Sequence, residues 1–134
     1  IELALELGMR RSEIANIKAQ HIKGNLLSIP VGKIKPRIIP LTPKALQLLR
    51  DNLPIKMSSN AIHLSWVRLT KKHGIEDARF HDLRHEALSR MFEDKSLNLP
   101  EVQLFSGHLE PRTLLRVYAN LKPQNLADKL AKMN

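Results

Sequence analysis

The chain has 134 residues, the usual length of one domain, and its 43% hydrophobic and 26% charged residues are typical of a globular protein with a buried core. It contains no cysteine, which excludes disulfides, thiolate catalysis and cysteine-ligated metal centres. Its 22 lysines and arginines against 13 acidic residues give a net charge of +9, which favours a polyanionic partner such as nucleic acid. No apolar run approaches the ~20 residues that span a bilayer, and the first residues do not resemble a signal peptide. We therefore expect a cytoplasmic, nucleoid-associated protein with no membrane partner.

The first forty residues predict a pair of short helices followed by a β-hairpin. Residues 1–20 carry apolar side chains at helical spacing, with Gly8 between two segments. Because this pattern begins without a capping residue, we expect further sequence upstream. In residues 25–41, two β-rich runs, Leu26–Ile29 and Arg37–Leu41, flank a segment rich in Gly, Lys and Pro. The prolines of this stretch each remove a backbone donor, so we expect both strands at sheet edges.

Proline, glycine and capping residues delimit helices in the rest of the chain. The expected helices run from Pro43 to about Arg50, from Asn60 to about Lys72, over 82–94, from Pro100 to Gly107, from Pro111 past Tyr118, and from Pro123 onward. The predicted fold class is mainly α with a small antiparallel β-hairpin or sheet (α+β), in a single domain over residues 1–134.

The N-terminal segment admits a second interpretation. Ala4, Gly8, Ile14 and Ile17 lie at positions expected of a helix-turn-helix unit, whose second helix, near Arg11–Lys18, enters a major groove. Many helix pairs joined by glycine share this spacing. On this interpretation the protein is a non-catalytic DNA-binding regulator.

Polar residues in the second half form a more specific pattern. The sequence HDLRH (81–85) is followed by SGH (106–108) and then by Tyr118, the only tyrosine in the chain. Taken singly, these are ordinary features: a solvated helix start, a helix-terminating glycine, and a core tyrosine with its hydroxyl at the surface. Together with GMRRSEI (8–14) and GKIKPRIIPL (32–41), and in this order, they resemble the tyrosine recombinases, or phage-type integrases. The resemblance extends over about residues 3 to 120.

This resemblance implies a site-specific recombinase that cleaves and rejoins duplex DNA through a 3′-phosphotyrosyl intermediate, without metal or cofactor. It implies Tyr118 as the nucleophile and Arg10 and Arg84 as a clamp on the phosphate, a role that suits the planar, permanently charged guanidinium. Arg11 competes with Arg10 for this role, and the family's pattern favours Arg10, which precedes Glu13 by three residues.

The other site residues also follow from the resemblance. His81 accepts the tyrosine proton or donates to the phosphate, since histidine titrates near neutrality, and His108 donates to the same phosphate. Lys33 in the hairpin turn supplies the proton for the leaving 5′-oxygen, with Lys35 as its competitor. Glu13 supports the site by orienting basic partners; alternatively, it is simply a favourable charge at a helix start. His85 is expected to be supporting or structural.

The expected partners are duplex DNA and further copies of the protein. With one Trp and three Phe, the chain offers no aromatic platform for single-stranded bases. The resemblance implies a tetrameric synapse on DNA, an upstream DNA-binding domain that this chain lacks, and a C-terminal segment (123–134) that docks on a neighbouring protomer or on its own core. Candidate phosphate contacts outside the site are Lys18, Lys23, Lys44, Arg68, Lys71, Lys72, Arg79, Arg90, Arg112 and Arg116.

Overall fold

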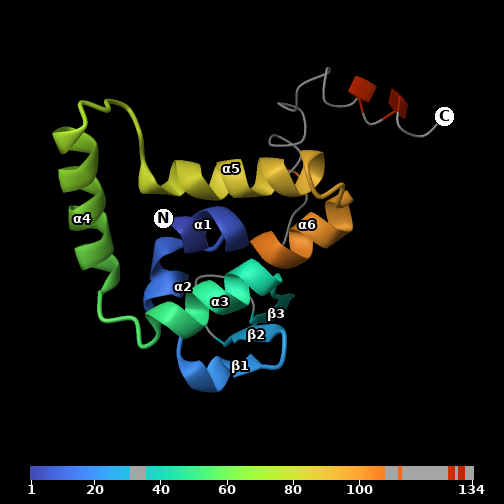
Figure 1. The fold of residues 1–134 in the computed structure, drawn as a ribbon, viewed down its shortest axis with the longest axis horizontal. Helices are drawn as coiled ribbons and strands as arrows, with labels where there is room; N and C mark the ends of the chain where they lie inside the picture. The colour runs from blue at the N-terminus through green and yellow to red at the C-terminus, as the bar shows by residue number, and fades with distance from the viewer. Residues whose placement is uncertain (31–35, 108–111, 113–126, 129, 132–134) are drawn as a thin grey trace.

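The computed structural model describes residues 1–30, 36–107, 112, 127–128 and 130–131, and it is mostly helical with one small sheet (Figure 1). The helices are α1 (Glu2–Leu7), α2 (Arg11–Ala15), α3 (Pro43–Asn52), α4 (Ser59–Lys72), α5 (Phe80–Glu93) and α6 (Leu99–Ser106), with a 3-10 turn η1 at Ala19–His21. The strands β1 (Ile22–Lys23), β2 (Leu26–Ile29) and β3 (Arg37–Pro40) form an antiparallel sheet in the order β1-β2-β3. This architecture confirms the predicted fold class.

The N-terminal helices are shorter than the apolar pattern predicts. Gly8 ends α1 in the left-handed conformation, at φ +65°, as expected of a helix-terminating glycine. Helix α2 then ends at Ala15, so the helix expected to continue towards residue 20 is wrong, and η1 takes its place. Glu13 and Ile14 of α2 are buried, and the helix packs against α4. A helix this short and this covered does not favour the helix-turn-helix interpretation.

The sheet contains one strand more than the sequence predicts. Strand β2 pairs with β3 as expected, with Leu27 opposite Ile39, and also with the unpredicted β1. The expectation that Leu26–Ile29 is an edge strand is therefore wrong. Pro30 follows the last residue of β2, so it removes no hydrogen bond from the ladder. Strand β3, which ends at Pro40, is an edge as predicted.

The later helices follow their capping residues closely. The hydroxyl of Thr42 accepts the backbone N–H of Ala45 at 3.1 Å and begins α3, which extends two residues beyond the expected end. Helix α4 is capped by Ser58 instead of Asn60, because the Ser58 hydroxyl reaches the N–H of Ala61 at 3.1 Å. Helix α6 ends at Gly107, as predicted. The helices expected from Pro111 and Pro123 fall largely outside the described residues.

Helix α1 lies at the centre of the fold, with α5 on one side and α3 on the other (Figure 1). Its inward residues Ala4 and Leu7 join a core that continues into the sheet and α3. A smaller apolar cluster joins α5 to α6 through Leu88, Met91, Phe92 and Val102. The ends of α1 and α6 meet the early turns of α5 near the start of α2, because Arg84 of α5 bonds to Gly8 and Ser106.

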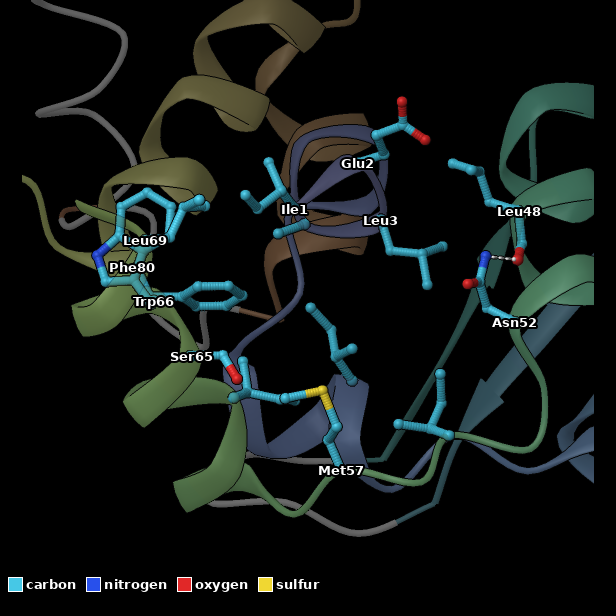
Figure 2. Close-up of a pocket in the computed structure, with 14 residues that line it drawn as sticks. Ile1, Glu2, Leu3, Leu48, Asn52, Met57, Ser65, Trp66, Leu69 and Phe80 are labelled. Atoms are coloured by element: carbon cyan, nitrogen blue, oxygen red, sulfur yellow. Dashed lines mark hydrogen bonds between the residues drawn. The ribbon is translucent and has the colours of Figure 1, made fainter. Parts of the chain in front are cut away.

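Helix α4 stands to the side of this core. Trp66 holds it there by donating its indole N–H to the carbonyl of Ala78 at 2.9 Å and by an edge-on contact with Phe80. An apolar pocket of about 430 Å³ lies between α4, the start of α1 and the end of α3 (Figure 2). Among the described residues, no helix is both long and apolar enough to cross a membrane.

Candidate active site

A polar cleft of about 540 Å³ lies where the start of α2 faces α5 and the first residue of α4. It collects Arg10, His81 and Arg84, which the sequence places in two separate motifs. Its lining residues are Met9, Arg10, Arg11, Ser12, Ser59, Phe80, His81 and Arg84. Arg10, His81 and Arg84 therefore meet in this cleft, whereas the pocket of Figure 2 is lined mainly by apolar side chains.

Arg84 anchors the cleft from α5. Its side chain is buried, and it donates to the carbonyl oxygen of Gly8 at 2.5 Å and to that of Ser106 at 2.6 Å. These bonds join α5 to the turn after α1 and to the end of α6. Burial, assisted by the nearby charge of Arg10, lowers the pKa of Arg84 to about 9, so the guanidinium stays protonated at neutral pH.

Arg10 approaches the same point from the start of α2. It precedes the first helical residue, and its Nη1 lies 3.4 Å from the carbonyl oxygen of Ser106. Two guanidinium groups therefore converge on one carbonyl. Burial lowers the pKa of Arg10. The negative charge of Glu13 acts to raise this pKa, and the positive charge of Arg37 lowers it further. Arg11 instead turns towards α4, where its Nε donates to the hydroxyl of Ser59 at 2.9 Å.

Glu13 is the acidic centre beneath these arginines. Its carboxylate, with 4% of the side chain exposed, accepts the backbone N–H of Arg10 at 2.9 Å. Arg37 donates to both of its oxygens, at 2.6 and 3.1 Å. Burial alone would raise the pKa of Glu13, but the hydrogen bonds and charges of Arg37 and Arg10 outweigh it and lower that pKa. Glu13 is therefore an ionised, buried carboxylate at neutral pH.

Arg37 is the residue of this cluster that sequence reasoning missed. It begins β3, and its Nε donates to the carbonyl oxygen of Phe105 in α6 at 3.1 Å. Strand alternation offered a signal, because Arg37 lies in phase with the fully buried Ile39 and opposite the buried Ile29. A charged residue on the inward face of a strand indicates a buried ionic partner.

The two histidines of the second motif lie in the first turns of α5. The ring of His81 contacts that of His85 edge-on, with the centroids 5.1 Å apart. Partial shielding from water, together with His85, Arg84 and Arg10, lowers the pKa of His81. The neutral imidazole, which can accept a proton, is therefore its dominant form at neutral pH.

Three of the predicted site residues, Lys33, His108 and Tyr118, lie outside the described residues, as does Lys35. Two of them lie close in sequence to described residues near the cluster. Lys33 precedes Arg37 in the stretch that leads into β3, and His108 follows Gly107 directly. Their roles stay predictions.

The sequence matches the phage integrase family over residues 1–125. The chain belongs to this family. It is 36% identical over 138 residues to a shufflon-specific DNA recombinase of Escherichia coli, a match that covers 96% of this chain and 35% of that protein. The resemblance predicted from the five motifs is thereby confirmed, and the chain spans about a third of this curated relative.

Solved integrase and recombinase structures share the fold. XerA recombinase superposes with a TM-score of 0.73 at 19% identity, over 98% of this chain and 56% of that one. The Tn1549 transposon integrase, in complex with a circular intermediate DNA, gives a TM-score of 0.75 at 15% identity, over 97% and 56% of the two chains. A lambda integrase dimer bound to a COC′ core site gives 0.70 at 18% identity, over 87% and 49%.

Proposed function

We propose that this member of the phage integrase family is a site-specific recombinase that cleaves and rejoins duplex DNA through a 3′-phosphotyrosyl intermediate on Tyr118. The observation that carries the proposal is the convergence of Arg10 and Arg84 on the Ser106 carbonyl, beside an open polar cleft. The Ser106 carbonyl brings the two guanidinium groups together, and a phosphate at the cleft would accept from their remaining N–H donors. The relatives that are recombinases or integrases support this reading.

In the proposed cleavage step, the Tyr118 oxygen attacks the phosphorus while the bond from phosphorus to the 5′-oxygen breaks. His81, neutral at this pH, accepts the phenolic proton, which phenol releases reluctantly because its pKa is about 10. Lys33, or Lys35, gives a proton to the departing 5′-oxygen. Rejoining reverses the step, with the 5′-hydroxyl of a second DNA end attacking the phosphotyrosine.

The arginines stabilise the negative charge that develops on the non-bridging oxygens in the transition state. Arg84 uses two of its five N–H donors on Gly8 and Ser106 within the described part of the chain, which leaves donors for a phosphate. Preorganised, partly desolvated cations of this kind stabilise such charge strongly. With two of them on one phosphate, the proposed scheme needs no metal ion. His108 would add a further donor, and a tetrameric synapse on DNA stays a prediction.

Covalent trapping tests the proposal. The chain is mixed at low salt, in the presence of a chelator, with a pool of nicked duplexes whose sequence is randomised around the nick. Low salt is used because phosphate binding weakens steeply as salt rises. We expect an adduct that survives denaturant with the unchanged protein and disappears with Tyr118→Phe. DNA binding without an adduct would instead support the non-catalytic regulator.

A further inference from the structure

Arg37 and Glu13 form the shortest ion pair of the described part of the chain, and Glu13 contacts Arg10, which lines the cleft. Their closest approach is 2.6 Å, and their side chains are 7% and 4% exposed. The ion pair next in length, Arg90 with Glu86 on α5 at 3.0 Å, has side chains about half exposed. A buried pair costs desolvation that a surface pair avoids, so its presence here calls for a reason beyond stability.

The geometry shows how Glu13 divides its contacts between Arg37 and Arg10. Glu13 lies three residues after Arg10, the residue that caps the start of α2, and the two side chains form a salt bridge. This salt bridge is long, at 3.9 Å, whereas both carboxylate oxygens accept hydrogen bonds from Arg37 at 2.6 and 3.1 Å. The only short contact between Arg10 and Glu13 is through the Arg10 backbone N–H, at 2.9 Å.

We propose that Arg37 is a positioning residue for DNA cleavage, which occupies the Glu13 carboxylate so that the Arg10 guanidinium stays available to the scissile phosphate. Without Arg37, Glu13 would be a buried anion whose nearest cation is Arg10. A bidentate pair between them would satisfy the carboxylate and withdraw Arg10 from the cleft. This inference rests on the proposed recombinase function.

The Arg37 guanidinium is held within the protein and does not line the cleft. Each of its three guanidinium nitrogens already donates, two to Glu13 and one to the carbonyl of Phe105. The end of α6 is shaped around it, since a Cβ at Gly107 would lie 2.9 Å from Arg37 Nη1. Arg37 therefore acts through Glu13 and Arg10, and it connects β3, α2 and α6 at one point.

A double-variant cycle separates this role from simple structural support. Arg37→Gln should slow adduct formation by on the order of ten- to a hundredfold, the worth of hydrogen bonds to a charged partner. Adding Glu13→Gln to Arg37→Gln removes the carboxylate that would capture Arg10, so the double variant should recover by roughly tenfold. Arg37→Lys, which offers a cation without the planar fork, should form the adduct at a rate between those of the unchanged protein and Arg37→Gln.

The control is an ion pair away from the cluster, Lys95 with Glu6 at 3.6 Å. Lys95→Gln alone and with Glu6→Gln should leave the adduct rate near that of the unchanged protein, with no recovery in the double variant. Thermal unfolding of each variant confirms that it is folded. Where Arg37→Gln does not fold, the comparison is made between Arg37→Lys and Arg37→Lys with Glu13→Gln.

A second readout does not depend on the chemical step. The affinity of each variant for a short fluorescent duplex at low salt, measured by anisotropy, should follow the same order, since it reports Arg10 at the phosphate. A double variant no better than Arg37→Gln in either readout overturns the inference. Absence of any adduct with the unchanged protein overturns the recombinase proposal, while the affinity cycle still decides whether Arg37 frees Arg10.

Discussion

The guanidinium of Arg84 donates to the carbonyl oxygen of Gly8 at 2.5 Å, and this bond ties the middle of the fold to the cleft. Gly8 is the residue that ends α1, and it packs against α5, since a Cβ there would be in van der Waals contact with Leu88 and Ala87 at 3.4 and 3.5 Å. Close packing of α1 on α5 therefore sets where Arg84 can reach. Arg84, which is proposed to bind phosphate, is also part of the structural core, so its replacement should reduce both DNA cleavage and stability.

Replacing Arg84 with Gln should lower the free energy of unfolding by about 3 kcal/mol, because two buried carbonyl oxygens lose a charged donor. Arg84→Lys should recover only part of this, since one ammonium cannot bridge Gly8 and Ser106 as the planar fork does. Urea unfolding measures the change. Arg90→Gln on the same helix, with a half-exposed side chain paired to Glu86, should cost less than about 0.5 kcal/mol and serves as control. Equal losses at the two positions would contradict the anchoring role of Arg84.

Gly107→Ala should slow cleavage, whereas a matched glycine replacement away from the site should not. The left-handed φ of +70° at Gly107 costs an alanine about 1 kcal/mol, and its Cβ would also displace Arg37, whose Nη1 and Cδ lie 2.9 and 3.0 Å away. Gly74→Ala is a matched control, because Gly74 has a φ of +64° and nothing within 4 Å of the added carbon. Gly107→Ala should lose at least as much stability in urea as Gly74→Ala, and it alone should slow the adduct by roughly tenfold or more. Equal adduct rates in the two variants would show that Arg37 tolerates the shift.

Local chemistry in the sequence was enough to predict some elements and not others. The Thr42 cap and the Gly107 terminator were predicted because each acts within one turn of its own helix. Strand β1 was not predicted, since two residues become a strand only by pairing with β2. The arginines could be grouped only by family resemblance, because Arg10 and Arg84 meet through the Ser106 carbonyl at the end of a third segment. Arg37 escaped notice because its partner Glu13 is distant in sequence and its inward direction depends on the sheet register.

The lowered pKa of Glu13 predicts a loss of stability in acid. Its ordinary pKa is 4.5, and the folded value lies below this, so the unfolded chain binds the proton more readily. The stabilisation is therefore complete above about pH 5 and is lost as the pH falls through the folded pKa. Urea unfolding at a series of acidic pH values should show this decline, and Glu13→Gln should flatten it. Glu86→Gln, at a carboxylate 53% exposed, should leave the decline in place.

The lowered pKa of His81 predicts the pH dependence of cleavage. As a proton acceptor, His81 is active when neutral, so the adduct rate should be at its plateau at neutral pH and fall only below pH 6.5. Single-turnover rates against pH, with the unchanged protein and His81→Gln, measure this, and the variant should lose the acidic limb. A rate that rises as the pH falls would assign His81 to hydrogen-bond donation towards the phosphate instead.

The competing lysines of the hairpin can be distinguished by the leaving group. Lys33→Ala and Lys35→Ala remove the same side chain two positions apart, and we expect the first to slow cleavage by roughly a hundredfold, as loss of a general acid does. In a duplex with sulfur in place of the bridging 5′-oxygen, the leaving group is a thiolate. It needs no proton, because thiols have a pKa of about 8.5, far below that of an alcohol. This substrate should restore the rate of the variant that lost the proton donor and leave the other unchanged. Rescue of Lys35→Ala alone would move the role to Lys35, and rescue of neither would place the proton donor outside the hairpin.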